Sequence, residues 1–202
     1  MHGWTLVVAL GLVLSPAARA DTLDSLLARG EVVLVETQPD GHLKQVTGIS
    51  RVEAPAAEVW AKLVDFAAYP EWMSNCAKAE VTEQGENYAV VDWSVRVPGP
   101  NVKFSGRYDY DPETWTIIGT HTGGALEGSH WEWRLVSDGD QTVMYRTVFS
   151  NVVADNWLVR QFEDEHHSME FGLNAATPVI ELIAVKNAFA TPVEEETTSP
   201  AP

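Results

Sequence analysis

The sequence is poor in three features that often decide the class of a protein: cysteine, positive charge and long apolar segments. Cys76 is the only cysteine, so no disulfide within the chain can support the fold and no thiolate metal site can form. The longest apolar run, residues 5–14, is shorter than the roughly 20 residues that a membrane-spanning helix needs. The fold therefore has to rest on an ordinary hydrophobic core.

Positive charge is scarce, because 13 Lys and Arg residues stand against 29 Asp and Glu residues and leave a net charge of −16. Nucleic acid is excluded as a partner, since phosphate binding needs clustered Lys and Arg. An anionic membrane surface is disfavoured by the same argument. The acidic surface either serves solubility alone or selects a basic periplasmic protein as a partner.

The first 20 residues have the pattern of a secretory signal peptide. The apolar run is followed by Ser15-Pro16 and by small residues that end at Ala20. We expect cleavage after Ala20, a mature chain in the periplasm or outside the cell, and no stable insertion into the membrane thereafter. Only His2 precedes the apolar run, without Lys or Arg, so a retained membrane anchor stays open as the alternative.

The next part of the sequence predicts a strand hairpin followed by a helix. Residues 31–37 and 42–52 are strand-like and flank the turn sequence Pro39-Asp40-Gly41. The helix begins near Pro55, and its apolar residues recur at helical spacing: Val59, Trp60, Leu63 and Phe66. It should end before Tyr69-Pro70, because the residue before a proline avoids helical geometry.

From about residue 80 to residue 151 the apolar residues alternate with a period of two, and turn sequences interrupt them regularly. This pattern predicts six antiparallel strands joined by short hairpins. One face of the sheet is expected to carry an unusual number of aromatic side chains: Trp93 in the second strand, Phe104, Tyr108 and Tyr110 in the third, and Trp131 and Trp133 in the fifth.

A long amphipathic helix is predicted from about Asp155 to Ala188. Its apolar stripe is Phe162, Met169, Leu173, Ala176, Ile180 and Ile183. Pro178 should kink the helix or start a second segment. Residues 191–202 contain three consecutive glutamates and several prolines, which predicts a disordered acidic tail.

This order of elements predicts an α+β fold in which a curved antiparallel sheet wraps around the long C-terminal helix. The chain also resembles the START-like or SRPBCC superfamily, and within it the polyketide cyclase/dehydrase and coenzyme Q-binding group. The resemblance rests on Val59-Trp60, Asp65-Phe66, Tyr69-Pro70 and Trp72 in the first main helix. It implies a helix-grip, START-like ligand-binding domain over residues 21–190. Members bind lipids, sterols, quinones or polyketides, and only some catalyse a reaction.

A cavity between sheet and helix is the expected ligand site, because large aromatic surfaces suit flat or isoprenoid ligands. Plain core packing is the alternative for each tryptophan. No cofactor, no metal and no catalytic residue is assigned. The candidate ligand-binding residues are Trp93, Phe104, Trp131, Trp133, Tyr145, Phe162, His166 and Met169.

Two groups of ionisable residues leave room for catalysis. The first group is Glu163, Asp164, His166, His167 and Glu170, whose spacing fits a solvated charged helix face, a polar group that orients a ligand, or a metal site. The second is His130 and Glu132, which share a strand face and alternate with Trp131 and Trp133, so the solvent side is the expected location.

The sequence thus favours an exported binding or carrier protein for a hydrophobic small molecule such as a lipid, a quinone or a polycyclic compound. One alternative is a cyclase- or dehydratase-like enzyme that uses the same cavity, with His130, Glu132 or His166 as acid and base. The other is an acidic accessory module that docks on a periplasmic protein.

Overall fold

A single antiparallel sheet of eight strands dominates the computed structural model, which describes residues 23–97, 99–151 and 168–190. The strands stand in the order β1-β2-β8-β7-β6-β5-β4-β3. Their bounds are β1 Val32–Thr37, β2 Leu43–Val52, β3 Cys76–Gln84, β4 Tyr88–Val95, β5 Val102–Asp111, β6 Thr116–Gly124, β7 His130–Asp138 and β8 Gln141–Phe149. The predicted hairpin and the six later strands are therefore confirmed.

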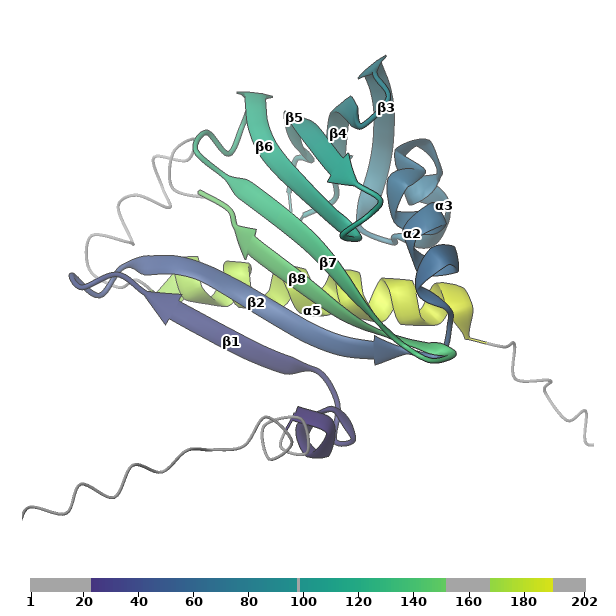
Figure 1. The fold of residues 1–202 in the computed structure, drawn as a ribbon. Helices are drawn as coiled ribbons and strands as arrows, with labels where there is room; N and C mark the ends of the chain where they lie inside the picture. The colour runs from purple at the N-terminus through teal and green to yellow at the C-terminus, as the bar shows by residue number, and fades with distance from the viewer. Residues whose placement is uncertain (1–22, 98, 152–167, 191–202) are drawn as a thin grey trace, which may run out of the picture.

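The helices that follow β2 lie on one side of the curved sheet, whereas a short helix at residues 23–27 precedes β1 at its edge, as Figure 1 shows. Three short elements follow β2: α2 (Ala56–Val64), which contacts β7 and β8, and the 3-10 turn η1 (Phe66–Ala68) and α3 (Tyr69–Trp72), which both pack on β3. The long helix α5 (Ser168–Phe189) crosses β2 and β8. We call the face that these helices cover the inner face and the opposite one the outer face. The arrangement is the START-like, helix-grip fold.

The first main helix is shorter than its apolar spacing suggests. Pro55 stands in extended geometry directly before α2, and the helix ends at Val64. Phe66 already belongs to η1, and Pro70 lies in the first turn of α3, where the missing N–H is no loss. The chain therefore bends twice around Asp65, which brings the rings of Phe66 and Tyr69 against the inner face of the sheet.

Close approach between α5 and β2 depends on Gly48. A Cβ atom at this position would lie 2.8 Å from Leu182 Cδ1 and 3.0 Å from Pro178 Cβ. Leu182 and Val185 of α5 are completely buried, as are Val46 and Met144 of the strands beneath. The helix thus covers β2 and β8 with tightly packed aliphatic side chains.

The predicted apolar stripe of the C-terminal helix is wrong in phase. Leu173, Ile180 and Ile183 are 47%, 44% and 40% exposed, whereas Asn174 is fully buried. The Asn174 side chain accepts a hydrogen bond from the Ser150 backbone N–H (2.6 Å) and donates to the Ser150 carbonyl (3.0 Å). These bonds compensate the burial of the amide, so a polar residue marks the inner side of α5. Apolar residues occupy both faces of α5, so the spacing of apolar residues did not show which face is buried.

Pro178 does not divide α5, since the helix runs without interruption from Ser168 to Phe189. Residues 155–167, where the long helix was expected to begin, lie outside the described residues. Among the helices of the described ranges, none is both long and apolar enough to cross a membrane.

Candidate functional site

Aromatic side chains gather on the inner face at the part of the sheet that α5 does not reach. Trp93 of β4 stacks on Phe104 of β5 with ring centroids 6.4 Å apart, and Phe104 stacks on Trp131 of β7 at 5.2 Å. Tyr108 of β5 lies 6.3 Å from Trp131 and nearly parallel to it. The strand period of two places all four rings on the same face.

The helical segment α2–α3 closes this group from the other side. Phe66 lies 4.9 Å from Tyr108, and Tyr69 lies 5.1 Å from Trp93, between ring centroids. The Tyr69 hydroxyl donates to the Leu63 carbonyl at 3.0 Å, which fixes its ring. We use the name aromatic cluster for these six residues: Phe66, Tyr69, Trp93, Phe104, Tyr108 and Trp131.

Two glycines let the Tyr108 ring lie against the sheet. A Cβ atom on Gly119 would stand 2.7 Å from Tyr108 Cε1, and one on Gly106 would stand 3.0 Å from Tyr108 Cε2. Any larger residue at these positions would push the ring away from the sheet. The small residues of β5 and β6 therefore shape the floor of the aromatic cluster.

Three buried polar atoms near the cluster have no aligned hydrogen-bond partner within the described part of the chain; two lie on the sheet, and the third is Nε1 of Trp72, whose ring lies 4.6 Å from that of Tyr69. The first is Nε1 of Trp93, a residue that is only 8% exposed; this N–H lies close enough to the Tyr108 hydroxyl to lower the pKa of Tyr108 slightly against the effect of burial, but it is not aligned with that oxygen as a hydrogen bond. The second is Nε2 of His121. His121 lies on β6 opposite Gly106, and alternation places it on the same face as Ile117 and Gly119. Buried donors and acceptors are nearly always satisfied, so both atoms favour an additional polar group at this place.

A buried ion pair stands where the cluster meets the helix. Arg146 of β8 donates from Nε to the carboxylate of Glu181 on α5, and its guanidinium lies 4.9 Å from the Trp133 ring centroid. Burial disfavours the charge, but the carboxylate of Glu181 outweighs that effect and holds the pKa of Arg146 above its ordinary value. The Arg146 guanidinium therefore remains charged despite its burial.

The two tyrosines of the cluster stay neutral at physiological pH. Burial is the main reason why the pKa of Tyr69 and the pKa of Tyr108 are both raised above the usual value of 10. Each tyrosine thus offers a neutral hydroxyl group for hydrogen bonding and an apolar ring surface for packing. The cluster presents an apolar, uncharged environment apart from the Arg146–Glu181 pair.

Comparison with known proteins agrees with this geometry. Residues 52–183 match the family model described as polyketide cyclase / dehydrase and lipid transport. The chain belongs to this family. A search of the curated proteins finds no significant match.

Several solved structures share the fold of this family member. The Zhui aromatase/cyclase from Streptomyces sp. R1128 has a TM-score of 0.62 and 24% identity, over 73% of this chain and 93% of that chain. A STAR-related lipid transfer protein from Xanthomonas axonopodis has a TM-score of 0.59 and 19% identity, over 79% of this chain and 93% of that chain. A START superfamily protein from Mycobacterium smegmatis has a TM-score of 0.53 and 16% identity, over 72% of this chain and 96% of that chain. At these identities the likeness concerns the fold.

Four of the eight ligand-binding residues expected from the sequence lie on one face of the sheet in this family member. Trp93, Phe104, Trp131 and Trp133 all lie on the inner face, and the three tryptophans are between 4% and 8% exposed. Phe162 and His166 lie outside the described residues. Met169 falls within α5, and its side chain is not described.

The expectation for Tyr145 is wrong, because its ring lies on the outer face. Tyr145 pairs with Arg134, whose guanidinium stands 4.1 Å from the tyrosine ring centroid. The neighbouring residues Met144 and Arg146 are the ones that point inward and are buried. A charged residue in an alternating strand ordinarily lies on the solvent side, so Arg146 made the opposite side of β8, with Tyr145, the expected inner face.

His130 and Glu132 also lie on the outer face, as their alternation with Trp131 and Trp133 indicates. The His130 ring stacks on Phe149 at 5.4 Å, and partial burial lowers its pKa. Neither residue reaches the aromatic cluster. Glu170 is buried at the beginning of α5, and the rest of its predicted group, Glu163, Asp164, His166 and His167, lies outside the described residues.

Sequence reasoning missed His121 as a candidate. The signal was present, because His121 alternates with Ile117 and Gly119 along β6 and thus shares the inner face. Phe66 and Tyr69 were recognised as helix and turn residues, but their contact with Trp93 and Tyr108 depends on the bend at Asp65.

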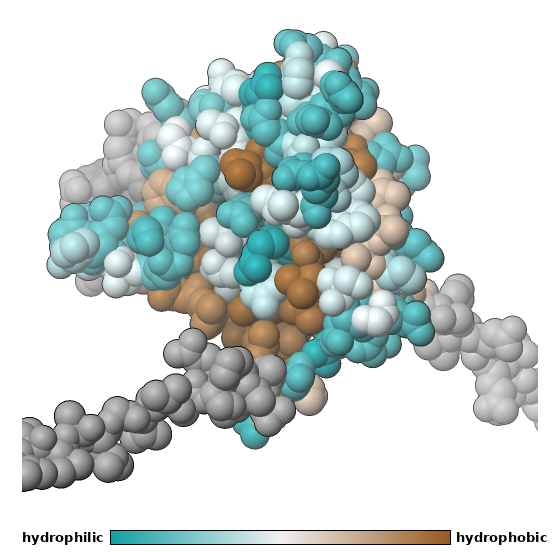
Figure 2. Space-filling view, viewed as in Figure 1, coloured by the Kyte–Doolittle hydropathy of each residue, from teal (hydrophilic) through white to brown (hydrophobic). Residues whose placement is uncertain are grey.

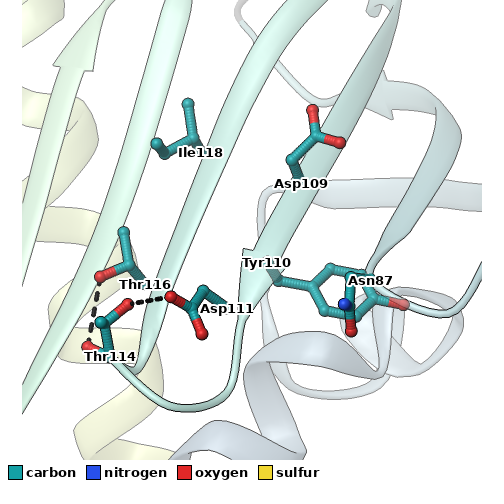
Figure 3. A pocket seen from close by; sticks show the side chains of 7 residues that line it. All are labelled: Asn87, Asp109, Tyr110, Asp111, Thr114, Thr116 and Ile118. Carbon is teal, nitrogen blue, oxygen red and sulfur yellow. Dashed lines mark hydrogen bonds between the residues drawn. The ribbon is translucent and has the colours of Figure 1, made fainter.

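A separate pocket of about 360 Å³ opens at the turn end of β4, β5 and β6. Figure 3 shows its side chains, which are mostly polar: Asn87, Asp109, Tyr110, Asp111, Thr114, Thr116 and Ile118. Asp111 accepts a hydrogen bond from the Thr114 hydroxyl at 2.8 Å, and this bond is the main reason why its pKa is lowered. The Asp111 carboxylate is thus already hydrogen-bonded within its own turn.

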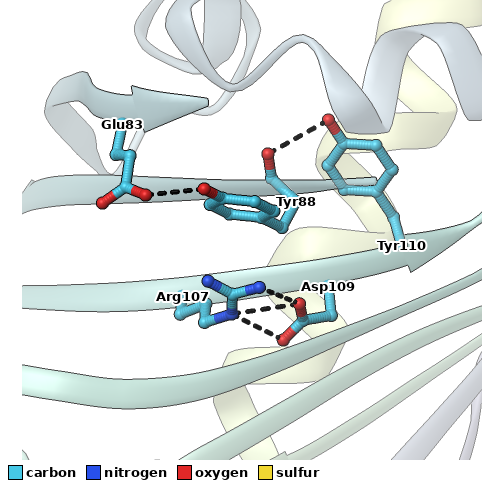
Figure 4. Close-up of polar contacts among 5 residues, drawn as sticks. All are labelled: Glu83, Tyr88, Arg107, Asp109 and Tyr110. Carbon is cyan, nitrogen blue, oxygen red and sulfur yellow. Dashed lines mark hydrogen bonds and ion pairs between the residues drawn. The ribbon is translucent and has the colours of Figure 1, made fainter. Parts of the chain in front are cut away.

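Charged contacts cover the outer face near this pocket, as Figure 4 shows. Arg107 binds both carboxylate oxygens of Asp109 and lies 3.8 Å from the centroid of the Tyr88 ring. The Tyr88 hydroxyl donates to Glu83 at 2.6 Å. The outer face of β4 and β5 is therefore polar and internally paired, in contrast to the inner face of the same strands.

Proposed function

We propose that this chain is an exported carrier that holds an oxygen-bearing, ring-shaped apolar molecule, such as a quinone or a polycyclic lipid, in the aromatic cluster. Membership of a family that includes lipid transport supports a hydrophobic ligand. Export rests on the pattern of residues 1–20, which is that of a signal peptide.

The observation that carries the proposal is the buried indole N–H of Trp93, which lies beside the Tyr108 hydroxyl amid stacked rings and makes no aligned hydrogen bond there. Aromatic rings offer stacking surfaces to a flat ligand, and the indole N–H offers a hydrogen bond to an acceptor oxygen. His121 Nε2 supplies a second polar atom at the inner face. A pure hydrocarbon would leave both atoms without a partner.

The enzyme alternative loses two of its three expected residues, since His130 and Glu132 point away from the inner face. A general acid or base has to reach the reacting group directly or through one water molecule. The geometry of the described residues therefore supports binding more directly than proton transfer by this pair.

A matched pair of probes tests the ligand class. Menadione and 2-methylnaphthalene share one carbon skeleton, and menadione carries two carbonyl groups on a quinone ring where 2-methylnaphthalene has an aromatic ring. We expect calorimetric titration of the purified chain to show tighter binding of menadione, and Trp93→Phe to raise the menadione Kd about fivefold, as for a hydrogen bond of about 1 kcal/mol. The same variant should leave the 2-methylnaphthalene Kd nearly unchanged.

Tyr145→Phe is the matched control, because it alters an aromatic ring on the outer face of the same sheet. Equal affinity for the two probes, or an equal effect of both substitutions, would contradict the hydrogen-bonding role of Trp93. Absence of binding to both probes, together with no apolar molecule in native mass spectra of the chain purified without detergent, would refute the carrier proposal. The N-terminal residue of the exported protein, expected to be Asp21, tests the signal peptide separately.

A further inference from the structure

The two edges of the sheet are built differently. The edge strand β3 has a charged middle, with Lys78, Glu80 and Glu83, and its pairing with β4 shifts register twice. The elements η1 and α3 also pack against it. Charged residues, bulges and covering helices are the devices by which proteins prevent an edge strand from pairing with another chain.

The opposite edge strand, β1, has none of these devices along its first four residues, Val32 to Val35. Its pairing with β2 is regular up to Glu36. Val33, Leu34 and Val35 are 37%, 51% and 48% exposed. Because successive residues point to opposite faces, β1 exposes apolar side chains on both sides of the sheet. Figure 2 shows hydrophobic side chains gathered over this region.

The apolar surface continues from β1 to α5. Val33 pairs with Gly48, which faces α5, so Val33 lies on the helix side of the sheet. Ile183 lies three residues before Lys186, whose ammonium group binds Glu31 next to β1 at 2.7 Å. Residues three apart share a helix face, so Ile183, 40% exposed, borders the same surface.

The carboxylates that flank β1 are already neutralised. Glu31 accepts from Lys186 and from Ser50, and Glu36 accepts from Lys44 at 2.9 Å and from Gln45. In a chain with a net charge of −16, most surfaces would repel a second copy. This edge combines internally paired carboxylates with exposed apolar residues and a row of backbone groups that no other described strand pairs with.

We propose that two copies of this chain pair antiparallel through their β1 edges and form a continuous sheet across a two-fold axis at Leu34. The same strand serves both partners, as a two-fold interface requires. In this register Val33 of one copy faces Val35 of the other, and each Val32 faces Glu36. Valine and leucine side chains then become buried on both faces of the joined sheet.

Sedimentation velocity of the full chain over a wide concentration range tests the pairing. We expect a dimer for the natural chain, and a rise of the dimer Kd by about tenfold or more for Leu34→Lys, because a lysine on the edge opposes its own copy. Ile118→Lys is the matched control: Ile118 is 52% exposed on β6, away from both edges. Its dimer Kd should stay unchanged.

A crosslinking experiment tests the register independently of the stability of the lysine variant. Cys76 is buried, so a cysteine in place of Leu34 would be the only exposed thiol of the described chain. Oxidation of Leu34→Cys should give a disulfide-linked dimer, whereas Ile118→Cys should not. A chain that is monomeric at every concentration, as expected if residues 5–14 or a membrane surface cover β1 instead, would overturn the proposal. So would a dimer that Leu34→Lys leaves intact.

Discussion

The inner face of the sheet has two parts that are filled by different means. Over β2 and β8, the helix α5 packs directly on the strands, with Leu182 against Gly48. Over β4 to β7, aromatic rings from the strands and from α2–α3 fill the space. A helix about 10 Å wide spans about two strands that are ~4.8 Å apart, so one helix cannot cover eight strands.

The two parts of the inner face also differ in how their buried polar atoms are hydrogen-bonded. In the helix-covered part the buried polar atoms of Asn174 are bonded to Ser150, and the buried oxygen without a hydrogen bond, Oε2 of Glu170, lies at the beginning of α5 rather than among its aliphatic side chains. In the aromatic cluster the N–H of Trp93 lacks an aligned hydrogen-bond partner among the described residues. The first part therefore stabilises the fold, and the second part is where the proposed ligand would gain specific contacts.

The largest expected effect comes from the ion pair that joins the two parts. Glu181→Leu leaves the buried guanidinium of Arg146 without its carboxylate and should reduce the free energy of unfolding by about 3–5 kcal/mol. Urea denaturation measures this loss. The double variant with Arg146→Met should recover most of it, and an equally unstable double variant would show that the pair is not the cause.

The next effect separates stability from binding. Leu182→Ala removes a fully buried side chain from the helix-covered part and should cost about 2–5 kcal/mol of unfolding free energy. The menadione Kd of the folded variant should stay unchanged, because Leu182 packs against Gly48 of β2 and is not one of the rings that form the aromatic cluster. A Kd that rises in proportion to the loss of stability would join the two parts into one functional unit.

For His121→Phe we expect weaker binding of menadione with little loss of stability, the opposite of the result for Leu182→Ala. Nε2 of His121 has no partner to lose within the described residues, so the free energy of unfolding should change by less than about 1 kcal/mol. The menadione Kd should rise about fivefold, since one polar contact is removed from the inner face. Chemical denaturation and titration of the same sample give both values, and a large loss of stability with an unchanged Kd would contradict this assignment.

A small pH effect is expected at the end of the helix-covered part. The hydrogen bond from Lys186 is the main cause that lowers the pKa of Glu31 below 4.5. A carboxyl with a lowered pKa stabilises the folded state above its unfolded pKa, and this contribution is lost as the pH falls through the folded pKa. Lys186 is partly exposed, so the contribution is under about 1 kcal/mol. Glu31→Gln should flatten the acid side of the stability profile between pH 5 and pH 3, and an unchanged profile would refute the link.

Alternation along the strands predicted the sheet and most of the aromatic cluster, because Trp93, Phe104 and Trp131 stand in strands where polar residues clearly occupy the other face. The phase of β8 and of α5 was not predictable in this way. Arg146 and Asn174 are polar residues on the buried side, and their partners Glu181 and Ser150 are remote in sequence. Only the tertiary contact reveals that such residues point inward.

The indole N–H resonances of the tryptophans, recorded by ¹⁵N–¹H NMR during titration with menadione, test the central claim most directly. Trp93→Phe assigns the Trp93 signal. The account predicts that this signal moves the most, in the direction of a new hydrogen bond, and that Trp131 follows through ring stacking while Trp115 changes little. An unmoved Trp93 signal under saturating menadione would contradict the assignment of the aromatic cluster as the ligand site.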